Sequence, residues 1–244
     1  DEAVVRSARV ALTGRRLLHV DGPYDLALRS LGTDGEALDE DADAAVLRVP
    51  TMTPVPAVEC GFKLAVRDIA AFETNGQPLD VSPAARAATA CAEREDEVVF
   101  NGVKSAGLGG LMTARGVQTC KLEPWKELGA AVDNVTAGVN KLDKAGFRSP
   151  YALALTPGLF NALFRRYPQG NQTELDHLDK VVGGAIVKAP NIAKGGVLVA
   201  AAKDLAAIVI GQDLAASFIG PAGHDYEFAV SGTAVLRLSD PAAA

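Results

Sequence analysis

Three prolines within seven residues, Pro50, Pro54 and Pro56, restrict the fold of this chain more than any other sequence feature. The surrounding stretch 45–72 has apolar residues at strand-like spacing, but proline lacks a backbone N–H and is excluded from central strands. We therefore predict an extended arm or an edge hairpin. Such an arm has too little apolar material to be stable alone, so we expect it to lie on another surface, most naturally a second copy of the chain.

Size and charge narrow the class of protein. The chain has 244 residues, enough to bury a sizeable core in one large domain or two joined ones. Its formal net charge of -6 argues against a protein that packages nucleic acid by charge, so no nucleic-acid partner is expected. No stretch approaches the ~20 apolar residues of a membrane span, and no signal peptide is visible. We expect a cytoplasmic protein without a membrane partner.

Two helices are predicted in the first hundred residues. Residues 1–13 have the pattern of the end of a helix that Gly14 stops, with one apolar face formed by Val4, Val5, Ala8 and Leu12. The acidic stretch 32–43 is expected to be an exposed loop. A second helix is predicted from Ser82 to Phe100, because a capping serine and a proline begin it and a glycine follows it.

The clearest helical pattern runs from Trp125 to Lys144, where apolar residues step by three or four: Trp125, Leu128, Val132, Val135, Val139 and Leu142. A strand is predicted at Tyr151–Leu155, and helices are predicted after Thr156 and after the capping residue Thr173. Four further segments are predicted to be strands, namely 185–188, 197–201, 206–210 and 226–238, with a kink in the last at Gly232. The chain is therefore assigned to the α+β class.

No catalytic or metal-binding motif is present in the sequence. The three histidines, His19, His177 and His224, are scattered along the chain. The three cysteines contain no CxxC pair, so we expect these thiols to be reduced and partly buried: Cys60, Cys91 and Cys120. The acidic run from Glu93 to Glu97 lacks the ExxH of a di-iron helix and is expected to be a solvated or subunit-facing helix side, with Arg94 as a partner. We predict no metal site, no cofactor and no enzymatic activity.

Five blocks of sequence, in register over nearly the whole chain, together resemble family 1 encapsulins, the linocin-like bacteriocin family. They are 14–24 with its Asp21-Gly22-Pro23-Tyr24 turn, the arm from Pro54 to Phe62 followed by 68–73 and 78–80, Glu93–Gly102 followed by Gly109-Gly110-Leu111, Ser149-Pro150-Tyr151, and 210–214. The family has the fold of the major capsid proteins of tailed phages.

The resemblance implies a division of the chain into five parts. Residues 1–42 would hold the N-terminal helix end and the start of a peripheral domain, and 43–80 an extended arm, the E-loop. Residues 81–124 would continue the peripheral domain with its spine helix. Residues 125–207 would form the axial domain around the five-fold vertices, and 208–244 would return as strands to the peripheral domain and the base of the E-loop.

The resemblance also implies a structural function. Copies of the chain, commonly 60, 180 or 240, would assemble into an icosahedral nanocompartment around a cargo enzyme concerned with iron storage or oxidative stress. Cargo proteins of the family carry a short terminal peptide that docks on the inner wall of the shell. The docking candidates carried over are Arg16, Leu17, Val20, Asp21, Tyr24 and Ile210, for each of which ordinary packing is the alternative.

An uncharged, amide-rich stretch falls where the family has its five-fold pore loop: Tyr167, Pro168, Gln169, Gly170, Asn171, Gln172 and Thr173. A pore built from it would select ions and small substrates by size more than by charge. We expect Gln169 and Asn171 to lie nearest the axis, the alternative being a plain loop between two helices. Some family members stack a flavin on an aromatic E-loop residue, but 64–68 has no Trp or Tyr, so no flavin is expected.

Two other functions stay open at the level of sequence. The first is a phage major capsid protein, which would enclose DNA and which the net charge of -6 disfavours. The second is a soluble α+β enzyme with a dispersed active site, which the missing motifs disfavour. Particle size distinguishes the enzyme from a shell, and nucleic acid in the purified particle would indicate the phage protein.

Overall fold

A computed structural model describes residues 1–33, 49–168 and 170–244. The helices are α1 (Glu2–Ala11), α2 (Gly14–Leu17), α3 (Val66–Asn75), α4 (Ser82–Asn101), α5 (Ala130–Lys144), α6 (Pro157–Ala162) and α7 (Glu174–Val182), with short 3-10 turns at Lys104–Ala106 and Pro241–Ala243. The strands are β1 (His19–Asp21), β2 (Ser30–Thr33), β3 (Thr51–Pro54), β4 (Ala57–Ala65), β5 (Tyr151–Leu155), β6 (Ile186–Lys188), β7 (Gly196–Ala200), β8 (Ala206–Ile210), β9 (Ala215–Ala222) and β10 (Asp225–Leu238).

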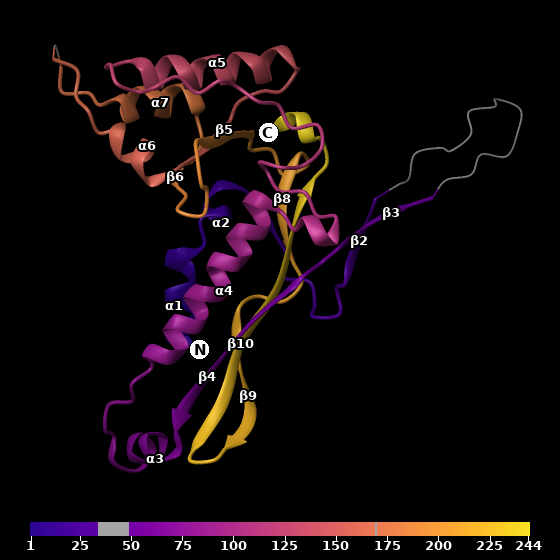
Figure 1. The fold of residues 1–244 in the computed structure, drawn as a ribbon, viewed down its shortest axis with the longest axis vertical. Helices are drawn as coiled ribbons and strands as arrows, with labels where there is room; N and C mark the ends of the chain where they lie inside the picture. Colours follow the sequence, from indigo (N-terminus) through magenta and orange to yellow (C-terminus); the bar gives the residue numbers. More distant parts are fainter. Residues whose placement is uncertain (34–48, 169) are drawn as a thin grey trace, which may run out of the picture.

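The strand β10, 14 residues long, organises the larger sheet (Figure 1). Its first part, 225–233, lies between β4 and β9, and its last five residues pair with β8, which in turn pairs in parallel with β1. The strand runs without interruption through Gly232, where a kink was expected. A Cβ there would lie 2.8 Å from Leu214 Cδ2, so the glycine permits the close approach of the neighbouring loop.

The helix α4 packs along this sheet together with α1 (Figure 1). The buried face of α4 is built from small residues, which lets α1 and the sheet approach it closely: Ala84, Ala87, Ala88, Cys91 and Ala92. The prediction of this helix is confirmed, with its end one residue later, at Asn101, before Gly102 with a positive φ of 69°. Ser82 does not cap it; its N–H and hydroxyl donate instead to the Asp80 carboxylate.

A smaller layer lies beyond the C-terminal end of α4 and contains the three-stranded sheet β6-β5-β7 with α5, α6 and α7 (Figure 1). The strand Tyr151–Leu155 is confirmed at both ends and is buried throughout. The helix α5 begins at Ala130 and not at Trp125, because Gly129 takes a positive φ of 96° and residues before it form turns. Trp125 is nevertheless buried, and its indole Nε1 donates to Asn134 Oδ1 at 3.0 Å.

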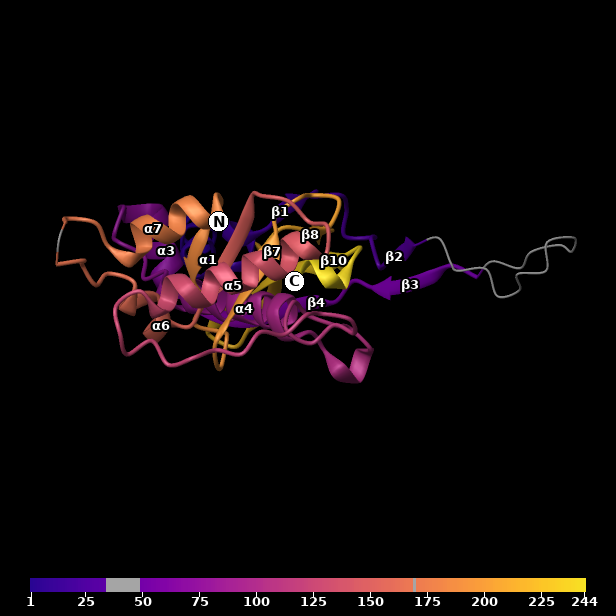
Figure 2. The same cartoon turned by 90° about the horizontal axis from the view of Figure 1, so that it is seen from above.

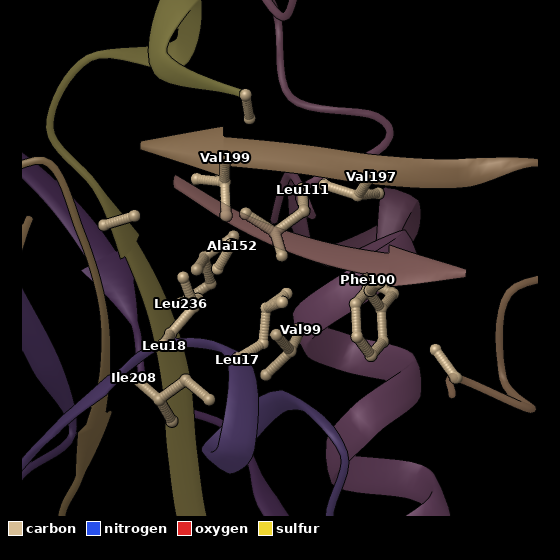
Figure 3. Close-up of a cluster of buried hydrophobic side chains, with 14 of the residues drawn as sticks. Leu17, Leu18, Val99, Phe100, Leu111, Ala152, Val197, Val199, Ile208 and Leu236 are labelled. Atoms are coloured by element: carbon tan, nitrogen blue, oxygen red, sulfur yellow. The ribbon is translucent and has the colours of Figure 1, made fainter. Parts of the chain in front are cut away.

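A shared core joins the two layers (Figure 3). It brings together side chains from α2, the end of α4, the central strands of both sheets and the segment after α4; the labelled members are Leu17, Leu18, Val99, Phe100, Leu111, Ala152, Val197, Val199, Ile208 and Leu236. Because these residues come from both layers, the core is continuous between them.

The proline-rich stretch differs from the prediction in one respect. Its prolines stand at strand ends as expected, with Pro54 closing β3 and Pro56 preceding β4. However, β4 pairs over nine residues with β10 of the same chain, and Val66–Asn75 is a helix. The segment that projects from the body is instead the hairpin of β2 and β3 (Figures 1 and 2). The predicted acidic loop lies largely outside the described residues, which resume at 49.

Candidate docking face and pore loop

The exposed turn after β1 carries two of the docking candidates. The hydroxyl of Tyr24 donates to Asp21 Oδ1 at 2.7 Å, and its backbone N–H donates to the carbonyl of Ile210 at 3.0 Å. Arg237 Nη1 lies 2.8 Å from the other Asp21 oxygen. The Tyr24 hydroxyl and then Arg237 lower the pKa of Asp21. These hydrogen bonds and the ion pair hold the turn in place. The Tyr24 side chain on it is 60% exposed.

The other docking candidates divide into two groups. Leu17 and Ile210 are only 4% and 2% exposed and belong to the core of Figure 3, so their side chains have almost no surface to offer a ligand. Val20 is half-buried and packs against the same core. Arg16 is exposed and lines a groove beside α1. The structure therefore brings Asp21, Tyr24 and the Ile210 backbone together, with Leu17 and Val20 beneath them.

The groove beside α1 has a volume of about 270 Å³ and lies between that helix and the loop after β8. Its apolar lining comes from Val5, Ala8, Leu12 and Leu214, and its charged lining from Arg9, Arg15, Arg16 and Asp213. Val5 was placed on the buried face of the helix, but it is 45% exposed. Sequence reasoning missed this groove, since a helical stripe does not show which of its residues a neighbouring loop leaves open.

The floor of this region is a group of charges, Arg15, Glu95, Asp96 and Asp213, called here the N-terminal clasp; Glu95 and Asp96 are buried, whereas Asp213 is exposed. Arg15 Nε lies 2.7 Å from Glu95 Oε1, and its Nη1 lies 2.6 Å from Asp213. The Asp96 carboxylate accepts the N–H groups of Thr13 and Gly14 at 2.7 and 2.8 Å, which satisfies the start of α2. Gly14 therefore begins a helix and does not merely stop α1.

The electrostatics of the N-terminal clasp follow from its burial. Glu95 and Asp96 are 3% and 1% exposed, so the expectation of a solvated acidic helix side is wrong for these two residues. Burial raises the pKa of Asp96, and the charge of Glu95 adds to that effect. Burial alone would lower the pKa of Arg15, but the bonds to Glu95 and Asp213 outweigh it and raise that pKa. Only Arg94 and Glu97 form the exposed ion pair expected here.

The stretch 167–173 forms the loop between α6 and α7, at the end of the molecule opposite the β2–β3 hairpin (Figure 2). The Tyr167 N–H donates to the Gln172 carbonyl at 3.1 Å, and Arg166 and Thr173 form an isolated antiparallel bridge. The loop is therefore closed at its base. Asn171 and its neighbours Pro168, Gly170 and Gln172 are exposed, whereas Gln169 lies outside the described residues.

The base of this loop is held by a second group of charges, Arg165 and Glu174, called here the loop clasp. Arg165 Nε lies 2.9 Å from Glu174 Oε2, and the other Glu174 oxygen accepts the N–H of Gly129 at 2.7 Å. Glu174 is completely buried. Thr173 caps α7 as predicted, in a reciprocal capping box with Asp176, and its backbone N–H and hydroxyl lower the pKa of Asp176.

Across 1–33, 49–168 and 170–244, no group of three His, Cys, Asp or Glu side chains could hold a metal ion. In the same ranges, no helix has the length and apolar character needed to cross a bilayer. The three cysteines are free; Cys91 is buried, which raises the pKa of its thiol to about 11, whereas Cys120 is exposed.

Solved structures show the fold. The chain superposes on the virus-like particle protein from Pyrococcus furiosus with a TM-score of 0.77 at 21% identity, covering 98% of this chain and 94% of that one. It also superposes on the capsid protein of the Myoviridae phage XM1 with a TM-score of 0.64 at 14% identity, covering 95% and 90% of the two chains. The predicted α+β, tailed-phage capsid fold is therefore confirmed.

Sequence comparisons show the family. The chain is 30% identical over 252 residues to the type 1 encapsulin shell protein EncA of Myxococcus xanthus, covering 99% of this chain and 88% of that protein. The profile of the Linocin_M18 family, described as an encapsulating protein for peroxidase, matches residues 1–235. The predicted family is thus confirmed over nearly the whole chain. This chain belongs to the Linocin_M18 family as a type 1 encapsulin shell protein, a structural protein and not an enzyme.

Proposed function

We propose that 60, 180 or 240 copies of this chain form a closed icosahedral compartment in the cytoplasm, around a cargo enzyme of the oxidative-stress or iron-storage type. The peroxidase in the family description favours the oxidative-stress alternative. The shell holds no nucleic acid, in keeping with the net charge of -6. Mass spectrometry of the proteins inside purified shells, with absorbance at 260 nm, tests cargo and nucleic acid together; a nucleic-acid-filled particle would refute the proposal.

The domain boundaries are part of this proposal. The layer of β5, β6 and β7 with its helices corresponds to the axial domain at 125–207, and the sheet around β10 to the peripheral domain at 1–42, 81–124 and 208–244. Within the arm at 43–80, β4 and α3 stay with the body of their own chain. We therefore place the E-loop at the hairpin of β2 and β3, which begins at Ser30 and so before the boundary at 43, and infer that this hairpin lies across a neighbouring copy.

The hairpin carries exposed apolar side chains that support this role. Met52 in β3 is 56% exposed and Val49 before it is 52% exposed, on a two-stranded ribbon that is marginal in water by itself. Met52→Asp is expected to convert shells into small oligomers, as measured by light scattering, whereas Met52→Leu should assemble normally. Intact shells from the Met52→Asp protein would contradict this role for the hairpin.

The docking proposal places the terminal peptide of the cargo along the groove beside α1 and toward the turn after β1. The observation that carries it is the pairing of an exposed apolar residue, Val5, with flanking arginines in a groove of about 270 Å³. Arg16, Asp21 and Tyr24 would contact the peptide directly. Leu17, Val20 and Ile210 would act by supporting that surface from below.

Encapsulation of a reporter tests this docking face. The terminal peptide of the cargo found in purified shells is fused to a fluorescent protein and co-expressed with shell variants. Val5→Asp and Tyr24→Ala are expected to lower the fluorescence in shells by tenfold or more, because they remove the apolar contact and the exposed ring. Val10→Asp is the matched control, since Val10 is 76% exposed on the same helix but does not line the groove. Equal loading by wild type and Val5→Asp would rule the groove out.

The pore proposal assigns the loop 167–173 to the five-fold vertex, with Gln169 and Asn171 nearest the axis. It is supported by the place of the loop at an extremity of the molecule and by the exposure of Asn171 (Figure 2). Such a pore passes ions and small substrates by size. Cargo-free shells imaged by electron cryomicroscopy at side-chain resolution test the assignment, and side chains of both residues pointing away from the axis would overturn it.

A further inference from the structure

A cavity with no part in docking or in the pore loop lies between α5, the strands β5 and β7 and the segment 117–122. Its volume is about 350 Å³. Pockets for small ligands range over roughly 300–1,000 Å³, so this cavity is large enough for a small molecule and too small for a peptide or a two-chain lipid.

The floor of the cavity is apolar. Leu153 and Leu155 of β5, Val197 and Leu198 from β7 and Leu142 of α5 all line it. Gly138 on α5 keeps it open, because a Cβ at that position would already lie 3.1 Å from Leu198 Cδ2. An occupant would therefore need a hydrocarbon or aromatic body.

The rim of the cavity is positively charged. Lys121, Lys141 and Lys194 line it, and none of its lining side chains in the described chain is an Asp or Glu, although the protein carries a net charge of -6. Lys121 pairs with Glu123 at 2.6 Å, and Lys141 donates one hydrogen bond to the Thr119 carbonyl at 2.9 Å. An ammonium group has three donors, so Lys141 and Lys194 have capacity left for an anion.

One lining residue, Asn134, carries a further donor. The Oδ1 atom of Asn134, a lining residue, accepts from both the Glu123 N–H and the Trp125 indole. Its Nδ2 amide has no partner among the described residues, and an amide donor complements a carboxylate oxygen.

We infer that this cavity binds a small amphipathic carboxylate, such as a medium-chain fatty acid, with its apolar body against β5 and β7 and its carboxylate at the lysine rim. The inference does not depend on the cargo or pore proposals. Size selects a single chain of moderate length, the apolar floor selects a hydrocarbon body, and the uncompensated lysines select an anion over a cation.

The cavity contains its own reporter, since Trp125 is the only tryptophan of the chain and lines the cavity. Assembled shells of the full chain are titrated with decanoate while tryptophan emission is recorded. A saturable change is expected. Octanoate should bind about tenfold more weakly, because two methylenes fewer are buried, and decanol about fivefold more weakly, because it lacks the charge.

Variants separate specific binding from a general detergent effect. Gly138→Leu should abolish the decanoate response by filling the cavity, and Lys194→Gln with Lys141→Gln should weaken decanoate but not decanol. Lys144→Gln is the matched control, because Lys144 lies one turn along α5 and does not line the cavity. Three outcomes would each overturn the inference. They are an unchanged response in Gly138→Leu shells, an equal affinity of wild-type shells for decanol and decanoate, and a response that appears only in dissociated subunits and not in intact shells.

Discussion

The N-terminal clasp and the loop clasp each pair a buried glutamate with an arginine, but they differ in the number of carboxylates around that arginine. In each, a buried glutamate on a helix holds an arginine that approaches from a distant or irregular segment, Arg15 on Glu95 and Arg165 on Glu174. In the N-terminal clasp, the Arg15 guanidinium contacts two carboxylates, the buried one of Glu95 and the exposed one of Asp213, while Asp96 beside Glu95 holds the start of α2. In the loop clasp, one guanidinium faces one carboxylate.

This difference shows that a buried ion pair cannot be valued by its distance alone. The Arg–Glu distances are nearly equal, 2.7 Å and 2.6 Å. However, the two arginines keep different ion-pair partners when the glutamate is removed. Arg15 keeps Asp213 when Glu95 is removed. Arg165 has no second carboxylate among the described residues, so the removal of Glu174 leaves an uncompensated charge beneath the loop 167–173.

The largest effect is therefore expected from Glu174→Ala. Because Glu174 is fully buried and Arg165 is 30% exposed, we expect a loss of about 3 kcal/mol in unfolding free energy. That loss corresponds to a thermal midpoint lower by roughly 10 °C, measurable by calorimetry. Glu174→Gln, which keeps an acceptor for the Gly129 N–H, should lose less than Glu174→Ala. A midpoint unchanged in Glu174→Ala would show that the loop base is held by other contacts.

A smaller effect is expected from Glu95→Ala. Arg15 retains its contact with Asp213, and the repulsion between Glu95 and the neighbouring Asp96 disappears. We expect a loss of about 1 kcal/mol, measured by calorimetry under the same conditions. If Glu95→Ala proves as destabilising as Glu174→Ala, the surplus of carboxylates in the N-terminal clasp has no energetic consequence and the comparison fails.

The smallest effect is a pH dependence of opposite sign in the two regions. The raised pKa of Asp96 means that folding takes up a proton, so its contribution to stability is complete below its usual pKa of 3.8 and is lost as pH rises through the raised value. The pKa of Asp176 is lowered, so its contribution is present above 3.8 and is lost on acidification.

Two asparagine variants measure these opposite signs. As pH falls from about 6 to about 3, wild type should gain stability relative to Asp96→Asn and lose it relative to Asp176→Asn, in melting curves recorded across that range. The two variants serve as controls for each other, since both remove one charge. Curves that move in the same direction would show that Asp96 is not held in the environment described.

Local sequence signals predicted the elements that depend on neighbouring residues. The helix cap at Thr173, the buried strand Tyr151–Leu155 and the helix beginning at Ser82 all depend on side chains within one turn or on a continuous apolar run. The α5 pattern was extended too far, because Trp125 and Leu128 continue its spacing although Gly129 breaks the backbone.

Site residues were harder to predict, since their exposure depends on distant partners. Leu17 and Ile210 belong to matching sequence blocks, but β8 and β10 bury them. Val5 repeats the spacing of its buried neighbours, yet it stays exposed at the groove. Glu95 and Asp96 lie in a run of charges that alone suggests solvent, but Arg15 and the start of α2 cover them.

The sequence by itself determined the family, the capsid fold and the proline-bounded ends of β3 and β4, because these depend on blocks in register and on the covalent geometry of proline. Only the tertiary structure decided that β4 pairs with β10 of the same chain, that Arg15 joins the buried Glu95 to the exposed Asp213, and that a cavity opens beneath α5. Those features arise between segments far apart in the chain, and local periodicity has no information about such distances.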